Sequence, residues 1–336
     1  MHTVTLIPGD GIGPEITTVT LEVLEAAGAQ ITWDRHEAGL PAIEKYRDPL
    51  PKEVLDSIQR NGVALKGPLT TPVGAGFRSV NVALRKEFDL YVNLRPVRSL
   101  EGIKSRWTDV DLIVFRENTE EFYAGIEHYI DAAKSAAETI GIVTRSGSER
   151  IIRYAFEYAR THGRKKVTVV HKANILKFTS GLFLDVAREI SKEYPGIETT
   201  ERIIDNMSMQ LVMNPGQFDE IVTTNLFGDI LSDLCSGLVG GLGLAPGANI
   251  GTSVSLFEAV HGSAPDIAGK NIANPGALIL ASAMLLKHLG EESIATRIEK
   301  AVASVVREGK FLTRDLNPTT PVSTVEMGRA IIAALE

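Results

Sequence analysis

Residues 223–234, TTNLFGDILSDL, join a short β-branched run to a helical pattern that begins near Asn225. Asp229 and Asp233 are separated by about one helical turn, so both carboxylates are predicted on one face of this helix. Two like charges on a half-buried helix are tolerated when a divalent cation or a basic group lies between them, and oxygen ligands favour Mg²⁺ or Mn²⁺. A capped amphipathic helix with an exposed acidic edge explains the same pattern.

Length and composition narrow the possible classes of protein. A chain of 336 residues exceeds the usual size of a single core and favours two lobes, or one large α/β domain with a subdomain. The net charge of -7 argues against a nucleic-acid partner, and the single cysteine, Cys235, excludes an internal disulfide. There is no signal-like N-terminal segment and no apolar run of about 18 residues, so we expect a cytoplasmic protein with no membrane partner.

Strands and helices alternate along the chain, which predicts a largely parallel sheet. Predicted strands cover residues 4–7, 29–34, 63–65, 90–94, 111–115, 138–145, 166–171, 198–204, 220–224 and 257–260. The loop at residues 8–13, PGDGIG, follows the first of them and leads into a helix. Its glycines do not fit G-x-G-x-x-G, whose last position would be Pro14, so a Rossmann fold is rejected.

A polar loop that leads into a helix is a candidate anion site. Residues 66–85, KGPLTTPVGAGFRSVNVALR, are irregular until a helix begins near Ser79. Ser79, Asn81 and Arg85 can meet at the start of that helix, where unpaired N–H groups and the helix dipole attract an anion. A serine N-cap beside an exposed arginine is the alternative interpretation.

Further polar residues stand at or near predicted strand ends. Arg95 and Arg116 add two guanidinium groups, which together with Arg85 make a clamp for a polycarboxylate plausible. Asp205 is a third carboxylate at such a position. A lone Tyr123 could simply pack with its hydroxyl group satisfied, and Lys172 could be an ordinary surface lysine.

Seven motifs in this chain resemble those of the β-decarboxylating dehydrogenases, the family of isocitrate, homoisocitrate and 3-isopropylmalate dehydrogenases. They are PGDGIGPE, KGPLTTPVG, LRP, FRENTEEFYAG, HKANILK, NLFGDILSD and HGSAPDIAGKNIANP. The resemblance covers nearly the whole chain. It implies an isopropylmalate dehydrogenase-like α/β fold, a twisted mixed sheet in two lobes that is not a Rossmann fold. It also implies a large domain from residues 1–95 and 253–336, and a small domain with the dimer interface from residues 96–252.

The resemblance implies chemical roles for the candidate residues. Asp205, Asp229 and Asp233 would bind Mg²⁺ or Mn²⁺. Lys172 would be the base for the substrate hydroxyl proton, and Tyr123 would protonate the enolate carbon. Because Asp205 and Lys172 reach in from a partner subunit in the family, a homodimer or higher homo-oligomer with shared active sites is expected.

The residues of the family's substrate loop differ between enzymes that act on isocitrate and those that act on isopropylmalate. Ser79, Asn81 and Arg85 match the isocitrate dehydrogenases, whereas isopropylmalate enzymes carry apolar residues there. The resemblance thus implies oxidative decarboxylation of isocitrate to 2-oxoglutarate and CO₂, a step of the tricarboxylic acid cycle. Homoisocitrate dehydrogenase and a non-catalytic regulatory subunit of isocitrate dehydrogenase remain alternatives. The expected substrate-binding residues are Lys66, Ser79, Asn81, Arg85, Arg95 and Arg116.

NAD is the cofactor expected from the resemblance. The family binds the adenosine half of the nucleotide along the segment after its His-Gly motif, and NADP-using relatives carry Lys and Tyr at the positions of Asp266 and Ile267. A carboxylate at Asp266 can accept hydrogen bonds from ribose hydroxyl groups but would repel a 2′-phosphate. A turn-capping role for Asp266 is the alternative. The expected cofactor-binding residues are Thr70, His261, Gly262, Ser263, Ala264, Asp266, Ile267 and Asn274.

Overall fold

The structure, a computed structural model of the chain, describes residues 2–72 and 76–335 and divides into two compact units. The terminal unit comprises Met1–Phe88, Ser99–Thr108 and Ser236–Glu336, and the central unit comprises Asp89–Arg98 and Asp109–Cys235. The division expected from the sequence, with borders after residues 95 and 252, stays a prediction, while the structure groups residues 236–252 with the terminal segments. Residues 73–75 of the predicted polar loop lie outside the described residues.

Five strands of the terminal unit lie in the order β2-β1-β3-β12-β11. β1 pairs in parallel with β2 and β3, β12 is parallel to β3, and β11 is antiparallel to β12. The strands are β1 His2–Ile7, β2 Ile31–Arg35, β3 Val63–Lys66, β11 Pro246–Ile250 and β12 Ser255–Ala259. The helices are α1 Gly13–Ala26, α2 Leu40–Tyr46, α3 Lys52–Asn61, α4 Val80–Glu87, α9 Gly276–His288, α10 Glu292–Glu308 and α11 Thr324–Ala333, and the 3-10 turn η3 covers Leu242–Leu244.

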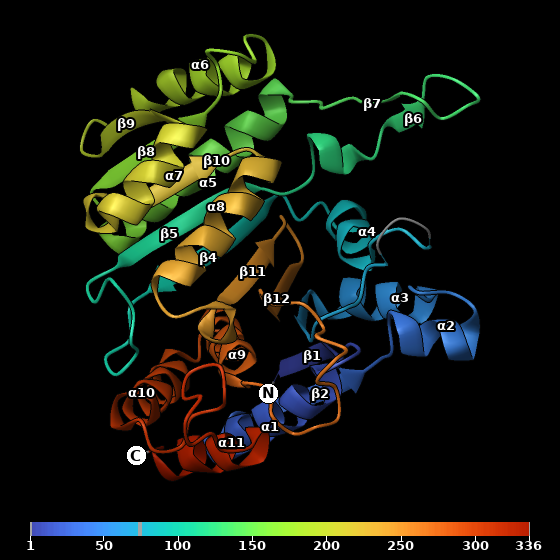
Figure 1. The fold of residues 1–336 in the computed structure, drawn as a ribbon, viewed down its shortest axis with the longest axis vertical. Coiled ribbons are helices and arrows are strands. Elements are labelled where there is room, and N and C mark those ends of the chain that lie inside the picture. The colour runs from blue at the N-terminus through green and yellow to red at the C-terminus, as the bar shows by residue number, and fades with distance from the viewer. Residues whose placement is uncertain (1, 73–75, 336) are drawn as a thin grey trace. The chain divides into compact units, whose positions relative to one another are not determined.

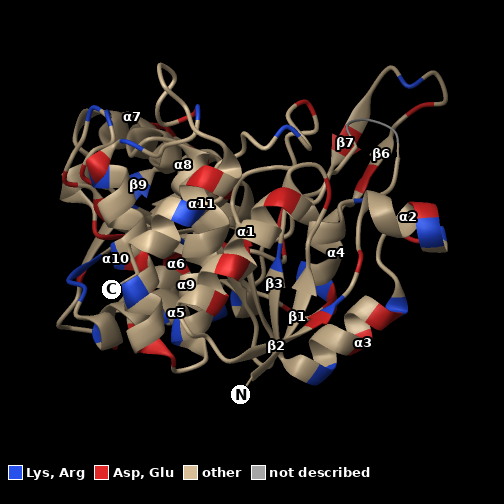
Figure 2. Cartoon of the chain, turned by 90° about the horizontal axis from the view of Figure 1, so that it is seen from below, with Lys and Arg blue, Asp and Glu red and all other residues tan. Residues whose placement is uncertain are grey.

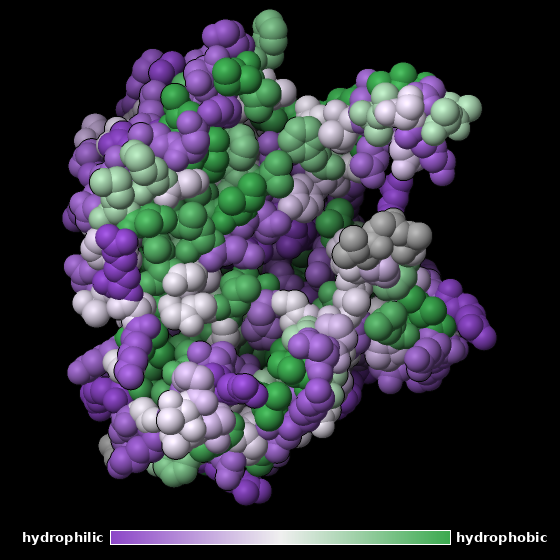
Figure 3. All heavy atoms as spheres, viewed as in Figure 1, coloured by the Kyte–Doolittle hydropathy of each residue, from purple (hydrophilic) through white to green (hydrophobic). Residues whose placement is uncertain are grey.

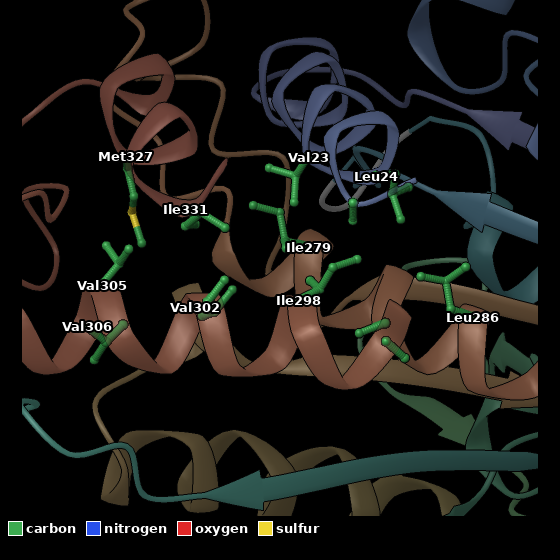
Figure 4. Close-up of a cluster of buried hydrophobic side chains, with 14 of the residues drawn as sticks. Val23, Leu24, Ile279, Leu286, Ile298, Val302, Val305, Val306, Met327 and Ile331 are labelled. Atoms are coloured by element: carbon green, nitrogen blue, oxygen red, sulfur yellow. The ribbon is translucent and has the colours of Figure 1, made fainter. Parts of the chain in front are cut away.

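A buried cluster of aliphatic side chains holds the helices of the terminal unit together (Figure 4). Val23 of α1, Ile279 of α9, Val302 of α10 and Ile331 of α11 are each fully buried in it. Helix α9 is apolar on almost every side because it also packs on β11 and β12, so it has no solvated face. Acidic and basic residues are interspersed along the other helices of this unit (Figure 2).

Five strands of the central unit lie in the order β4-β5-β10-β8-β9. β5, β10, β8 and β9 are parallel to their neighbours, whereas β4 is antiparallel to β5. The strands are β4 Val92–Arg98, β5 Asp111–Glu117, β8 Lys166–His171, β9 Glu198–Ile203 and β10 Glu220–Thr223. The helices are α5 Arg145–His162, α6 Thr179–Ser191, α7 Ile204–Met213 and α8 Asn225–Leu238, whose last turn belongs to the terminal unit, and the 3-10 turns η1 Phe122–Ala124 and η2 Pro215–Gln217 complete the set.

A two-stranded arm extends from the central unit (Figure 1). It consists of β6 Glu127–Tyr129 paired antiparallel with β7 Ala137–Thr139, and every residue of both strands is exposed. The predicted strand at residues 138–145 is therefore wrong beyond Thr139. Pairing with β6 ends there, and Thr144 instead caps helix α5 by accepting a hydrogen bond from Gly147 N at 3.0 Å.

The sequence-based prediction overlooked helix α2 and strands β6 and β11. Pro41 stands in the first turn of α2, and Pro246 is the first residue of β11. The broad alternation of strand and helix is otherwise confirmed. None of the helices within residues 2–72 and 76–335 combines the length and apolar character needed to span a bilayer.

In each unit the carboxyl ends of the parallel strands face one sheet edge, which is where ligand sites form in open α/β sheets. In the central unit Arg116, Lys172, Asp205 and Asn225 stand at or just after the ends of β5, β8, β9 and β10. In the terminal unit the loops at residues 8–12, 67–72 and 260–266 follow β1, β3 and β12. These two sets contain nine of the nineteen predicted site residues.

Candidate active site

Asp229 and Asp233 lie one turn apart on α8 and share one pair of arginines. Arg95 on β4 approaches both carboxylates, with Nη2 3.7 Å from Asp229 Oδ1 and Nη1 3.3 Å from Asp233 Oδ1. Arg116 at the end of β5 pairs with Asp229 Oδ1. Both guanidinium groups are buried, whereas the Asp229 and Asp233 side chains keep 42% and 56% of their surface exposed. The buried arginines therefore offset the negative charge of the two carboxylates, which remain accessible to a ligand.

Neutral side chains of the same helix fix the arginines in place. Arg95 Nη1 donates to Ser232 Oγ at 2.5 Å, and Arg116 Nε donates to Asn225 Oδ1 at 2.9 Å. Gly228 lets the helix approach this closely, because a Cβ there would lie 2.5 Å from Cβ of Arg116. The rigid guanidinium fork of each arginine thus has a fixed direction, which suits the recognition of a carboxylate.

Tyr123 belongs to the same cluster. Its hydroxyl group donates to Asp229 Oδ2 at 2.7 Å, and the Arg116 guanidinium carbon lies 5.0 Å from its ring centroid. The lone tyrosine of the sequence pattern therefore meets a predicted metal ligand and a predicted substrate ligand. This contact places a phenolic proton donor beside the paired carboxylates.

The paired carboxylates suit a hard divalent cation. Partial burial raises the pKa of Asp233, Arg95 opposes the shift, and the neighbouring Asp229 charge adds to it. A bound cation would relieve this repulsion, and an all-oxygen donor set matches Mg²⁺ or Mn²⁺. Within the described residues no three His, Cys, Asp or Glu side chains form a metal-binding group. Asp205 is thus not part of a three-carboxylate group in this chain.

Asp205 instead pairs with Lys172, which with Tyr123 was predicted to be catalytic. Lys172 Nζ lies 2.5 Å from Asp205 Oδ1, joining the residue after β8 to the first turn of α7. The hydrogen bond from Lys172 lowers the pKa of Asp205. The prediction that these two residues serve a partner subunit's site stays a prediction.

The predicted substrate loop has the expected local geometry. Ser79 is the N-cap of α4 and accepts a hydrogen bond from Val82 N at 3.4 Å, as in the alternative interpretation, whereas Arg85 is buried and is not the exposed arginine of that interpretation. The buried Oδ1 of Asn81 has no hydrogen-bond partner among the described residues. Because a buried acceptor without a partner is costly, Asn81 is suited to a ligand that donates a hydrogen bond.

The predicted contact of Lys66 with substrate stays a prediction. Its side chain is buried, and Nζ pairs with Glu258 Oε2 at 2.7 Å and donates to Gly67 O at 3.0 Å. Burial disfavours the ionised Glu258, but Lys66 and Arg85 outweigh it and hold the pKa of Glu258 at about 2. The ammonium group of Lys66 is thus committed to the fold, and contact with a substrate would require this pair to open.

His261 has the strongest indication of a ligand in the cofactor segment. Its Nδ1 lies 3.0 Å from Gly262 O, and a carbonyl only accepts, so Nδ1 carries the proton. Burial lowers the pKa of His261, which favours the neutral ring. The buried Nε2 then offers a lone pair that no described residue uses. A ribose hydroxyl or amino group fits this acceptor.

The other predicted cofactor residues divide into two kinds. Gly262 and Asp266 are exposed, Ala264 and Ile267 are partly buried, and all four are accessible to a ligand. Asn274 is buried and uses its side chain within the fold, since its Nδ2 donates to Asp315 Oδ2 at 2.9 Å and its Oδ1 accepts from Gly276 N at 2.8 Å.

Sequence reasoning missed the residues that support the site. Asn225 and Ser232 orient the arginines, and Glu258 neutralises Lys66. The signal for Asn225 and Ser232 was present, because they lie on the same predicted helix as Asp229 and Asp233. No local pattern pointed to Glu258.

Two buried arginines, a tyrosine and paired carboxylates thus meet between the sheet and helix α8 of the central unit, as suits an enzyme of the α/β class that binds a carboxylate ligand. The chain belongs to the isocitrate/isopropylmalate dehydrogenase family, whose sequence profile matches residues 3–331. The resemblance seen in the motifs and the fold class are thereby confirmed.

Three relatives illustrate this membership. The crystal structure of isocitrate dehydrogenase from Methylococcus capsulatus is 60% identical, with a TM-score of 0.98 and coverage of 100% of this chain and 99% of that one. The mitochondrial isocitrate dehydrogenase (NAD) catalytic subunit 5 of Arabidopsis thaliana is 51% identical over 98% of this chain and 87% of its own length. The chloroplastic 3-isopropylmalate dehydrogenase of Solanum tuberosum is 50% identical over 91% and 85%, respectively.

Proposed function

We propose that this protein oxidatively decarboxylates isocitrate to 2-oxoglutarate and CO₂, with NAD as the hydride acceptor and Mg²⁺ or Mn²⁺ as the metal. One observation carries the proposal. Asp229 contacts Arg95, Arg116 and Tyr123, which supports a site in which two carboxylate-binding groups and one proton donor surround the proposed metal ligands.

The identity of the substrate rests on particular residues, because relatives that carry the names of two different enzymes match to similar extents. Arg95 and Arg116 suit two carboxylates of a hydroxy acid. Ser79 and Asn81 on the start of α4, with Arg85 on its last turn, provide polar groups for the additional carboxylate of isocitrate. A carboxylate can accept hydrogen bonds from the Asn81 amide Nδ2 and the Ser79 hydroxyl group, whereas an alkyl group cannot, which disfavours isopropylmalate.

The metal would be held by Asp229 and Asp233, with Asp205 supplied by a partner subunit. When bound, the ion supplies Lewis-acid stabilisation of negative charge on a substrate oxygen. Arg95 and Arg116 orient the carboxylates and hold the substrate next to them.

Proton transfer is assigned to two side chains. Lys172 removes the proton of the substrate hydroxyl group, and Asp205, 2.5 Å away, orients its amine. Tyr123 delivers a proton to the carbon left by CO₂, and Asp229 holds the phenol in place beforehand. The two residues therefore act at opposite ends of the reaction.

NAD would lie along residues 261–267. His261 Nε2 accepts a hydrogen bond from the nucleotide, and the exposed Asp266 carboxylate accepts from the ribose hydroxyl groups. A 2′-phosphate would meet this carboxylate, which disfavours NADP.

We also propose a homo-oligomer. Met209, Val212 and Met213 of α7 and Ile230 of α8 are exposed apolar side chains of the central unit, and Figure 3 shows an apolar patch over these helices. Such a patch marks a protein contact in a soluble protein. The cytoplasmic location stays a prediction, and the relatives named above include proteins of mitochondria and chloroplasts.

The test is turnover of isocitrate by purified protein with NAD and Mg²⁺, followed as NADH formation and 2-oxoglutarate release. Activity should disappear with EDTA and return with Mn²⁺. Arg95→Ala should raise the KM for isocitrate at least about tenfold, the effect of one lost charge-assisted pair. Arg98→Ala on the same strand is the matched control, since Arg98 is exposed and pairs with the exposed Asp111. A protein that binds isocitrate but forms no NADH with metal present would instead be a regulatory subunit.

A further inference from the structure

We propose that Asp10 is a positioning residue for the cofactor, which acts through Thr70 on the hydroxyl group of Ser263. The inference rests on the proposed NAD site at residues 261–267. It gives a role to the loop PGDGIG at residues 8–13, which does not fit a dinucleotide fingerprint.

Asp10 lies at the centre of three loops of the terminal unit. Its side chain is buried, with 4% of the residue exposed. Oδ1 accepts two hydrogen bonds from Thr70, from the backbone N at 2.8 Å and from Oγ1 at 2.6 Å. Oδ2 accepts from Leu40 N at 3.3 Å. Asp10 thereby holds the loop after β3. None of the hydrogen bonds described for its side chain reaches residues 261–267.

The direction of the hydrogen bonds extends this effect to Ser263. Thr70 Oγ1 and Ser263 Oγ are 2.6 Å apart. Because a carboxylate only accepts, the Thr70 hydroxyl proton points to Asp10, and the Ser263 hydroxyl must donate to Thr70. The lone pairs of Ser263 are then directed to a ligand. The relay prepares Ser263 to accept a hydrogen bond from a donor such as an amide or hydroxyl group of the nucleotide.

The backbone of the Gly-rich loop fits the same purpose. Ile12 N donates to Ser263 O at 2.9 Å, and Asp10 N donates to Pro68 O at 3.0 Å. Gly11 has a φ of +59°, and a Cβ there would lie 2.0 Å from Ser263 O. The following residue, Ala264, has a left-handed φ of 40°, which a residue with a side chain adopts only when its surroundings impose it. Residues 8–13 therefore fix both cofactor loops.

The decisive measurement is the Kd of NADH and of isocitrate, by fluorescence and calorimetry, for the full-length protein and its variants. Asp10→Ala should raise the Kd of NADH about tenfold, because the relay loses its charged acceptor, and should leave the Kd of isocitrate within about twofold. Asp10→Asn should restore NADH affinity to within about threefold of wild type, since its amide oxygen can accept both bonds from Thr70.

A double-mutant cycle separates positioning from direct contact. If Asp10 acts through Thr70, the Asp10→Ala/Thr70→Val variant should bind NADH no more weakly than Thr70→Val does. Ser57→Ala is the matched control. Ser57 belongs to another buried Thr-Ser-Asp network in this unit, with Oγ 2.8 Å from Thr5 Oγ1 and 2.7 Å from Asp34 Oδ2. Its loss should lower the thermal stability and leave the Kd of NADH unchanged.

The outcomes separate this inference from the proposed function. Wild-type protein that turns over isocitrate with NAD, together with an Asp10→Ala variant of unchanged NADH affinity or additive effects in the cycle, would overturn the positioning role only. Wild-type protein that binds no NADH would overturn the proposed cofactor and this inference with it. If Asp10→Ala does not fold, the Kd values of NADH for Asp10→Asn and Thr70→Val test the inference instead. A loss of NADH affinity in Asp10→Asn equal to that in Thr70→Val would contradict the relay.

Discussion

Tyr123 donates its hydroxyl hydrogen bond to Oδ2 of Asp229 at 2.7 Å, while Arg116 pairs with Oδ1 of the same carboxylate. One aspartate thus orients a proton donor with one oxygen and a substrate-binding cation with the other. A change at Asp229 is therefore expected to affect metal binding, substrate binding and protonation together, whereas changes at its partners should separate these functions.

Changes at Lys172 and Tyr123 should separate the two half-reactions. Lys172→Met removes the base and should abolish hydride transfer from isocitrate. Tyr123→Phe keeps the ring over Arg116 but removes the proton, so the steps after decarboxylation should be slowed more than NADH formation in the first turnover. Rapid-mixing measurements of NADH and single-turnover formation of 2-oxoglutarate distinguish the two.

Exposed residues of the same types provide the controls for this prediction. Lys165→Met, just before β8, and Tyr46→Phe, on α2, should both behave as wild type. An unchanged rate in Lys172→Met or Tyr123→Phe would remove that residue from the mechanism.

Substrate preference should follow the polar residues of α4. Turnover of homoisocitrate or 3-isopropylmalate should be at least about tenfold less efficient than that of isocitrate, as kcat/KM, which is the effect of one methylene or one lost ion pair. Ser79→Leu should lower kcat/KM for isocitrate and narrow its margin over 3-isopropylmalate, because it replaces a hydroxyl group with an alkyl surface. Equal or better turnover of homoisocitrate by the wild type would assign the enzyme to that acid instead.

Cofactor preference should depend on the charge of residue 266. We expect kcat/KM to be higher for NAD than for NADP, and the double change Asp266→Lys and Ile267→Tyr to shift the ratio toward NADP, because the lysine replaces a repelling charge with a cation for the 2′-phosphate. Steady-state kinetics with both nucleotides checks this. Asp266→Asn is the control, since it removes the repulsion and adds no cation, so it should weaken the discrimination and not reverse it. A wild-type preference for NADP would show that this interpretation of the pocket is wrong.

Stability should fall as pH rises because of Glu220. This carboxyl group is fully buried in β10, and burial, with a smaller effect of Asp219, raises its pKa from 4.5 to about 8. The folded state then keeps a proton that the unfolded chain releases above pH 4.5. The contribution of the protonated Glu220 to the free energy of unfolding is therefore complete below pH 4.5 and is lost as the pH rises toward 8. The slope approaches about 1.4 kcal/mol per pH unit.

Denaturant unfolding of wild type and Glu220→Gln between these pH values measures the effect. Glu220→Gln should flatten the pH dependence of the unfolding free energy, whereas Glu53→Gln, on the exposed side of α3, should leave it as in the wild type. A parallel pH dependence in wild type and Glu220→Gln would show that Glu220 is not the group responsible.

Local patterns in the sequence were sufficient for part of this description. The alternation of strands and helices, the shared helix face of Asp229 and Asp233, and the polar residues at strand ends depend on backbone periodicity over a few residues, so they could be predicted. The family motifs are short and ordered, and they identified the same residues. The boundary of β7 could not be predicted, because it depends on where pairing with β6 ends.

Only the tertiary structure decided which charges meet. β3 lies beside β12 and Lys66 is in register with Glu258, so the charge of Lys66 is neutralised inside the fold, while its predicted contact with substrate stays a prediction. Asp10, Thr70 and Ser263 come from three distant segments and form one relay. The physical reason is that a buried charge or hydroxyl group must find a partner, and strand order, which no local pattern encodes, determines which partner is within reach.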